Sequence, residues 1–364
     1  MSTTDLSDLT VPTTGTVLTS VAGRVDAVLD AFLADQASEL ASLDPALIPV
    51  AEAVTDLITT GGKRLRPAFV WWGHRASTNT PDEEVLKPAG AVELLHTFAL
   101  IHDDIMDRSA TRRGLPAVHT YLGEHHRRSG LQGDSDWFGV GGGILAGDMV
   151  FVWADIIFEA ARLPHEEMGR ARQVFARLRT EVMAGQYLDL RLSGLRQATD
   201  ADSLRVSLLK SGRYTVTRPL QMGAAFGTPS PSLDAALVAF GDAIGVAFQL
   251  RDDVLGLVGN PDSTGKGALE DVREGKQTLL MLRARDLAGP AERKVLSQVL
   301  GDPNATVDDV DAVRQIVVET GALADVERRI ARLRAQAEGA VTTLSESVRC
   351  ALLELASEAI DRRT

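Results

Sequence analysis

Three carboxylates stand within five residues of one apolar segment, at Asp103, Asp104 and Asp107. Apolar residues recur at helical spacing through residues 93–107, so on an α-helix Asp103 and Asp107 lie one above the other, with Asp104 about 100° round the axis. Burying such like charges unpaired is costly. Because hard divalent cations bind carboxylate oxygens, the pattern favours a Mg²⁺ site. An exposed acidic helix end, capped by the arginines that follow, would carry the same residues.

A second acidic pair, Asp252 and Asp253, closes another apolar segment with helical spacing, residues 233–257. Carboxylates on two facing helices could hold a cluster of Mg²⁺ ions against one shared anion. The second pair therefore favours the metal interpretation over an exposed acidic helix end.

The basic residues that could bind a phosphate fall into three groups. The run from Lys63 to Arg66 directly follows Gly61-Gly62, so backbone N–H groups and guanidinium groups could both bind a phosphate. The other basic groups are Arg112, Arg113, Lys210, Lys266 and Lys276. One basic cluster is usually a solvated turn, but with two acidic helix ends the set predicts a diphosphate site. Such a site would promote loss of diphosphate by stabilising the developing negative charge.

Composition narrows the class of protein. The net charge of -12 argues against bulk nucleic-acid binding. The single Cys350 excludes an intramolecular disulfide and fits a reducing cytoplasm. Residues 1–16 lack a signal-peptide pattern, and no uncharged apolar run reaches the ~18 to 20 residues of a membrane helix. A P-loop, a Rossmann fingerprint, a nucleophile elbow and a zinc-ligand set are absent. We therefore expect a soluble, cytoplasmic protein with no membrane span.

Abundant Ala and Leu, with few alternating β-branched runs, predict an all-α chain. We expect a disordered N-terminal tail over residues 1–17 and one domain over residues 18–364. Apolar spacing predicts helices over residues 21–41, 47–57, 93–107, 166–194, 202–226, 233–257, 307–319, 323–338 and 341–360, with another from 144. The glycine-rich residues 123–143 predict a long, mobile surface loop.

The chain resembles the trans-isoprenyl diphosphate synthases, the polyprenyl synthetase family. The residues that carry the resemblance are Gly61 to Pro67, Leu94 to His96, Leu100 to Gly114, Phe248 to Asp253, Gly265-Lys266 and Gly275-Lys276. The resemblance runs from about residue 20 to the C-terminus. It implies a single large helical bundle of the isoprenoid synthase type around a deep central cavity, commonly as a homodimer.

The resemblance also implies roles for the matching residues. Asp103, Asp104 and Asp107, with Asp252 and Asp253 opposite, would bind up to three Mg²⁺ ions that bridge an allylic diphosphate. That diphosphate would be held by Arg112, Lys210, Gln249 and Lys266, with Lys276 nearby. The diphosphate of isopentenyl diphosphate would be held by Gly62, Lys63, Arg66, His96 and Arg113. Ser211 stands where the family usually has Thr, which keeps the hydroxyl.

The family mechanism fits this set of residues. Metal-assisted departure of diphosphate leaves an allylic cation, and the isopentenyl double bond attacks it. The sequence offers no dedicated base for the proton that is then lost, and in the family the departing diphosphate is thought to take it. The protein would contribute mainly proximity and electrostatics.

Two features bear on how this chain differs from other members. Gly256 stands where many members have a third aspartate of the second acidic motif, which removes one carboxylate. In the family, bulky side chains just before the first acidic motif form the floor of the pocket that receives the growing chain. Here Phe98 and Ala99 occupy those positions. The pattern resembles synthases that make geranylgeranyl diphosphate (C20), with farnesyl diphosphate (C15) as the alternative. On an ideal helix Ala99 lies about 40° from Asp103 and Phe98 about 140° away.

Two other classes have to be weighed. A class I terpene cyclase also has an aspartate-rich helix, but Gly267 replaces the acid of its second metal motif, which would begin at Asn260, and the basic cluster at 63–66 would be unexplained. A non-catalytic subunit of a heteromeric synthase would be expected to have lost an acidic motif, and both are present. The sequence therefore favours the synthase.

Overall fold

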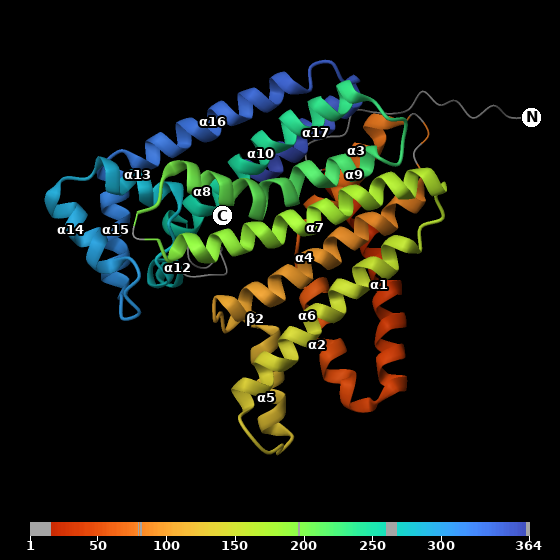
Figure 1. Cartoon of the computed structure of the whole chain (residues 1–364), viewed down its shortest axis with the longest axis horizontal. Helices are drawn as coiled ribbons and strands as arrows, with labels where there is room; N and C mark the ends of the chain where they lie inside the picture. Colours follow the sequence, from red (N-terminus) through yellow and green to blue (C-terminus); the bar gives the residue numbers. More distant parts are fainter. Residues whose placement is uncertain (1–15, 79, 81, 196, 260–267, 362–364) are drawn as a thin grey trace, which may run out of the picture.

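The computed structural model describes residues 16–361 apart from 79, 81, 196 and 260–267. Within these residues the chain is almost entirely helical (Figure 1). The first half contains α1 (Thr16–Leu43), α2 (Ile48–Thr59), α3 (Leu65–Ser77), α4 (Leu86–Met106), α5 (Val118–Arg128), α6 (Ser135–Glu159) and α7 (His165–Ser193). The second half contains α8 (Asp200–Val206), the π-helix η3 (Ser207–Thr217), α9 (Arg218–Ala224), α10 (Pro231–Val258), α12 (Ala268–Glu274), α13 (Leu279–Leu287), α14 (Pro290–Val299), α15 (Val307–Glu319), α16 (Ala322–Ala340) and α17 (Glu346–Ile360).

Short elements join some of the helices. The 3-10 turns η1 (Pro45–Leu47) and η2 (Glu83–Val85) precede α2 and α4. A two-stranded antiparallel hairpin, β1 (Thr111–Arg112) and β2 (Leu115–Pro116), follows α4. Its two turn residues have positive φ, 53° at Arg113 and 78° at Gly114, which matches the right-handed twist of a tight hairpin.

The long helices form one bundle around a shared apolar core. In this bundle α4 packs against α6, and η3 packs against both α7 and α10. Figure 1 shows α16 running along the bundle, with α13, α14 and α15 gathered at one end. The core includes Phe158 and Phe175, whose rings stack with centroids 5.0 Å apart. The all-α bundle predicted from the sequence is confirmed.

Helix ends follow local signals that the sequence carries. Thr306 begins α15 with a capping box to Asp309, and the helix covers the predicted residues 307–319. At the N-terminus α1 begins at Thr16 and Val17 is buried, so the predicted tail ends two residues too late. Residues 1–15 of that tail lie outside the described residues.

The prediction of a long loop over residues 123–143 is wrong. Helix α5 extends to Arg128 and α6 begins at Ser135, so only residues 129–134 connect them. The carboxylate of Asp134 starts α6 by accepting hydrogen bonds from the backbone N–H groups of Asp136 at 2.9 Å and Trp137 at 3.1 Å.

The glycines that suggested a loop are helix-packing positions instead. A Cβ at Gly139 would lie 2.2 Å from the carbonyl oxygen of His119 on α5. A Cβ at Gly147 would lie 2.3 Å from Nε2 of His102 on α4. Because glycine has no side chain, α6 can approach both neighbouring helices closely.

The π-helix η3 is held by similar close approaches. A Cβ at Gly185 of α7 would lie 2.3 Å from the backbone nitrogen of Lys210, and a Cβ at Gly245 of α10 would lie 2.4 Å from Cα of Gly212. Wide helical turns of this kind are frequent at functional sites. The backbone that carries Lys210 is therefore fixed between two long helices.

Two helices of the described chain, α6 and α10, have the length and hydropathy that a membrane span would need. Within the most apolar window of each, 39% of the residues of α6 and 50% of those of α10 are buried in the bundle. Length and composition alone are weak evidence for a membrane span, because the core helix of a soluble protein has the same properties. Both helices are parts of the bundle.

The close contact at Gly139 gives a test of the packing. Gly139→Ala should destabilise the protein by about 1–3 kcal/mol, because the new methyl group must displace a backbone carbonyl. Gly169→Ala on α7 meets nothing within 4 Å and should instead stabilise by up to about 1 kcal/mol through helix propensity. Urea unfolding of both variants measures the difference, and equal midpoints would contradict the packing role.

Candidate active site

A cavity of about 670 Å³ lies where α3, α4, α7, η3 and α10 meet. This volume is typical of a small-molecule site. Fourteen residues predicted for the site line it: Gly62, Lys63, Arg66, His96, Ala99, Asp103, Arg112, Arg113, Lys210, Ser211, Gln249, Asp252, Asp253 and Lys276. Residues more than 200 positions apart in the chain thus surround one space.

Three other predicted residues do not line this cavity, namely Phe98, Asp104 and Asp107. Lys266 lies outside the described residues. Asp104 is buried, and its carboxylate accepts hydrogen bonds from Nε of Arg112 at 2.9 and 3.2 Å. In this structure Asp104 thus anchors Arg112. A direct metal contact of Asp104 or Asp107 stays a prediction.

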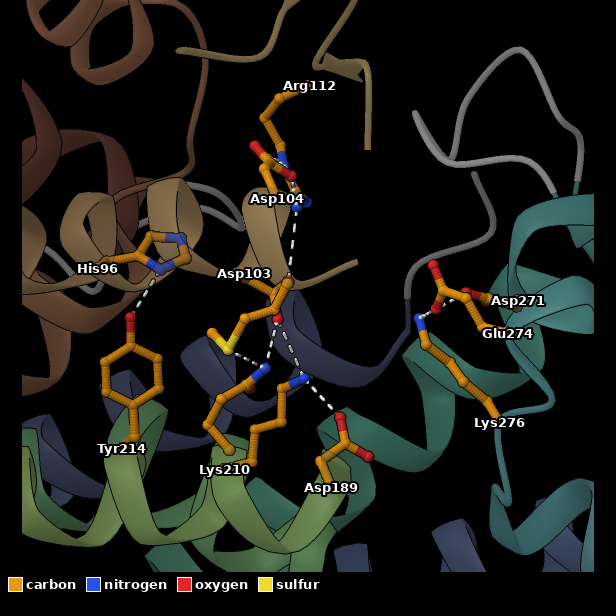
Figure 2. Close-up of polar contacts among 12 residues, drawn as sticks. His96, Asp103, Asp104, Arg112, Asp189, Lys210, Tyr214, Asp271, Glu274 and Lys276 are labelled. Carbon is orange, nitrogen blue, oxygen red and sulfur yellow. Dashed lines mark hydrogen bonds and ion pairs between the residues drawn. The ribbon is translucent and has the colours of Figure 1, made fainter. Parts of the chain in front are cut away.

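The end of α4 is joined to α7 and η3 through Asp103. Its carboxylate lies 3.3 Å from Nζ of Lys210 and accepts a hydrogen bond from Nε2 of Gln186 at 3.0 Å. Lys210 also lies 2.6 Å from Asp189 (Figure 2). Burial lowers the pKa of Lys210, but the carboxylates of Asp103 and Asp189 outweigh it and raise that pKa above its ordinary value. Lys210 is therefore a charged bridge between two carboxylates.

The end of α10 carries the second acidic pair. Nε2 of Gln249 donates to Oδ1 of Asp253 at 2.7 Å. Burial raises the pKa of Asp253 to about 7, although the bond from Gln249 lowers it, and the carboxylates of Asp252 and Asp271 raise it further. Asp253 is therefore a carboxylate whose charge would be stabilised by a cation.

The structure places a carboxylate beside Gly256, where the third aspartate is missing. A Cβ at Gly256 would lie 3.0 Å from Oδ2 of Asp271, which belongs to α12. Nζ of Lys276 forms ion pairs with the carboxylates of Asp271 at 2.6 Å and Glu274 at 3.0 Å (Figure 2). Asp271 thus brings a carboxylate to this end of the cavity from another helix.

The basic loop after α2 is held by a buried arginine. The side chain of Arg64 is 5% exposed and lies 2.8 Å from the carboxylate of Glu93 and 2.6 Å from that of Asp26. It also donates to the carbonyl of Ile58 at 2.7 Å. Because these partners lie on α1, α2 and α4, the loop that carries Lys63 is fixed against three helices.

Arg113 and the last helix secure the same loop from other sides. Nη1 of Arg113 donates to the carbonyl of Thr60 at 3.1 Å, and Lys63 forms an ion pair with Glu358 of α17 at 2.9 Å. The helix α17 is in turn fixed to α10, because Nε of Arg251 donates to the carbonyl of Ile360 at 2.9 Å. The loop that carries Lys63 is therefore held both by Arg113, from the first half of the chain, and by α17, near its C-terminal end.

His96 lines the cavity among the basic residues. Its Nδ1 lies 2.6 Å from the hydroxyl of Tyr214 on η3. Burial, together with the charges of Arg66 and Arg113, holds the pKa of His96 well below its ordinary value. His96 is therefore neutral at physiological pH.

Several residues at the site were not predicted from the sequence to belong to it: Arg64, Glu93, Gln186, Asp189, Tyr214 and Asp271. Gln186 and Asp189 stand three residues apart, so they share a face of α7, which is a signal that a polar site lies there. That spacing does not reveal their partners, because Asp103 and Lys210 come from distant parts of the chain.

The donors around the cavity fit Mg²⁺. Among the described residues, no three His, Cys, Asp or Glu side chains converge so as to hold a metal ion by themselves. Mg²⁺ commonly completes its shell with water and substrate phosphate oxygens. Asp103, Asp252 and Asp253 offer hard oxygen donors to one cavity, and a cation there would offset the burial of Asp253.

Comparison with known proteins gives one consistent family. The model of the polyprenyl synthetase family matches residues 49–317. A geranylfarnesyl diphosphate synthase from Aeropyrum pernix is 34% identical over 277 residues, which are 75% of this chain and 80% of the relative. A geranylgeranyl diphosphate synthase from Methanosarcina mazei is 33% identical over 267 residues, 73% of this chain and 75% of the relative.

A solved structure is similar over nearly the whole chain. The geranylgeranyl pyrophosphate synthase from Corynebacterium glutamicum, complexed with isoprenyl diphosphate and magnesium, is 34% identical with a TM-score of 0.89. The match covers 97% of this chain and 100% of that one.

The raised pKa of Asp253 predicts a pH-dependent stability of the metal-free protein. An acid whose folded pKa lies above its unfolded value destabilises the fold as pH rises from about 4 to about 7. Asp253→Asn should therefore raise the Tm at pH 8 by a few degrees, corresponding to about 1–2 kcal/mol, and this gain should vanish near pH 4.

The control is Asp30→Asn, which removes the same charge from an exposed position on α1. Scanning calorimetry at several pH values, with EDTA present, makes the comparison. A gain for Asp253→Asn that does not change with pH, or that Asp30→Asn reproduces, would contradict the assignment.

Proposed function

This chain belongs to the polyprenyl synthetase family, and we propose that its product is geranylgeranyl diphosphate (C20). It is a prenyl diphosphate synthase, which condenses isopentenyl diphosphate head to tail with an allylic diphosphate. The observation that carries this function is the single cavity that brings the acidic ends of α4 and α10 together with basic residues of α3 and η3.

The acidic side of the cavity is proposed to bind the allylic diphosphate. Asp103, Asp252 and Asp253, together with Asp104 and Asp107, would hold up to three Mg²⁺ ions, which when bound supply positive charge to the departing diphosphate. Lys210 and Arg112, both charged, lie beside Asp103 and would add further donors to its oxygens. Ser211, Gln249, Lys266 and Lys276 complete the set proposed for this diphosphate.

The basic side is proposed to bind isopentenyl diphosphate. Gly62, Lys63, Arg66, His96 and Arg113 supply donors there. Fixing both substrates in one cavity would place the isopentenyl double bond beside the allylic carbon, which lowers the entropic part of the barrier. We assign the final proton loss to the departing diphosphate, as in the family.

Product length is proposed to depend on the wall below Asp103. Ala99 lines the cavity, whereas Phe98 is buried between α4 and α6. The Phe98 ring packs 5.0 Å from Phe151 and 4.7 Å from His102. Ala99 thus leaves room for the growing chain, and Phe98 supports the wall behind it. C15 remains the alternative product.

The function is tested by incubating the purified protein with Mg²⁺, isopentenyl diphosphate and each allylic diphosphate, and then measuring product length. We expect C20. A cyclic hydrocarbon formed without isopentenyl diphosphate would indicate a terpene cyclase, and no product from the chain alone would indicate a non-catalytic subunit.

Ala99→Phe should shorten the main product to C15, because the new ring enters the cavity. Phe98→Ala should lengthen it, and an unchanged distribution in both variants would place the floor elsewhere.

We also propose that the enzyme is a homodimer that acts in the cytoplasm. Helix α6 exposes large apolar side chains, including Trp137 at 73% and Leu145 at 65%, with Val152 and Ile156 further along. Large exposed apolar faces mark interaction sites, and a two-fold axis would pair the same face of two copies. The preceding helix α5 packs on α6 and could widen the contact.

The dimer is tested by reversing the polarity of this face. The double variant Leu145→Arg, Val152→Arg should elute as a monomer in size-exclusion chromatography with light scattering, because two desolvated charges would oppose association. Leu43→Arg is the control, since Leu43 is also exposed but lies at the end of α1. A monomeric wild-type protein, or a dimer that survives the double variant, would refute the proposal.

A further inference from the structure

Tyr214 contacts two residues assigned to the second substrate. Its hydroxyl lies 2.6 Å from Nδ1 of His96, and its ring lies below the guanidinium of Arg66, 4.5 Å from the ring centroid. Tyr214 belongs to η3, whereas Arg66 and His96 belong to α3 and α4. Figure 2 shows the tyrosine rising from η3 towards one nitrogen of the imidazole, with the other nitrogen on the far side.

The direction of the hydrogen bond follows from burial. Tyr214 is 4% exposed, and the acceptor within reach of its hydroxyl is Nδ1 of His96, since Arg66, which also bonds to this hydroxyl, can only donate. If Nδ1 were the donor, the phenolic hydrogen would be buried without an acceptor, at a cost of about 1–3 kcal/mol. Burial also raises the pKa of Tyr214, so the phenol keeps its hydrogen. The tyrosine therefore donates, and Nδ1 accepts.

The position of the imidazole hydrogen then follows. A nitrogen that accepts a hydrogen bond carries no hydrogen, so the single hydrogen of a neutral imidazole is on Nε2. The guanidinium groups of Arg66 and Arg113 oppose a second proton on His96. The His96 ring lines the cavity, and among the described residues Nε2 has no hydrogen-bond partner.

We propose that Tyr214 is a positioning residue that holds His96 in the Nε2–H form, so that this N–H donates to the diphosphate of isopentenyl diphosphate. The identity of that anion rests on the proposed function. In this form His96 is a neutral hydrogen-bond donor beside the guanidinium groups of Arg66 and Arg113. A charged imidazolium in its place would be repelled by these two cations. The ring of Tyr214 also stabilises Arg66 through a cation–π contact.

The tautomer can be measured in the wild-type protein without any substrate. Long-range ¹H–¹⁵N spectra of the protein labelled at its histidines distinguish a protonated from an unprotonated ring nitrogen. His96→Gln identifies the His96 signals by their loss. We expect hydrogen on Nε2 alone throughout the range from pH 6 to pH 9. Hydrogen on Nδ1, or a doubly protonated ring near pH 7, would overturn the proposal.

Tyr214→Phe removes the hydroxyl and keeps the ring below Arg66. The His96 signals should then shift towards a mixture of tautomers, and the KM for isopentenyl diphosphate should rise about 5- to 10-fold. The KM for the allylic substrate and kcat should change by about twofold or less. Tyr121→Phe is the matched control, because its hydroxyl contacts Glu52 on the surface. Unchanged His96 signals in Tyr214→Phe would refute the role of the hydroxyl.

Two substitutions of His96 test which nitrogen meets the substrate. The amide nitrogen of Gln can stand near the place of Nε2, whereas that of Asn stands near the place of Nδ1. His96→Gln should therefore keep a KM for isopentenyl diphosphate at least about fivefold lower than His96→Asn. Equal KM values would overturn the assignment of Nε2. A wild-type protein with no synthase activity would refute the proposed function, while the wild-type spectra would still decide the tautomer.

Discussion

The site depends on keeping several carboxylates ionised around one cavity. Like charges in a partly buried space raise one another's pKa, and neutral carboxyl groups would bind metal poorly. The protein meets this constraint with cations from neighbouring elements: Lys210 bridges Asp103 and Asp189, and Lys276 bridges Asp271 and Glu274. Asp253 differs from the carboxylates that these lysines bridge. Its hydrogen bond comes from the neutral amide of Gln249, and its pKa is raised to about 7.

These bridges require backbones that lie close together. A lysine side chain can reach carboxylates on two helices only if its own backbone is near both. The glycine contact between Gly185 and the backbone of Lys210 provides this distance on one side, and the contact between Gly212 and Gly245 provides it on the other. The same principle applies to α6, whose glycines admit α4 and α5. The close packing of these helices therefore determines which carboxylates the lysine side chains can reach.

Much of the site could be predicted because its residues lie at helical spacings within single segments. His96 and Asp103 are seven residues apart on α4, and both line the cavity. The same geometry set Asp104 about 100° away from Asp103, and in the structure Asp104 turns to Arg112. The roles of Asp189 and Tyr214 could not be predicted, since each depends on a partner far away in the chain. Glycine is ambiguous in a sequence for a similar reason: at 139 and 147 only the neighbouring helix distinguishes a packing position from a loop.

The ion pair between Lys63 and Glu358 has a consequence for how the molecule is made. It joins a loop synthesised early to the last helix, and Arg251 binds the carbonyl of Ile360 in that same helix. During translation the basic loop therefore lacks its final neighbours until nearly the whole chain has left the ribosome. The contacts that α17 makes with this loop and with α10 can therefore form only after α17 has been synthesised.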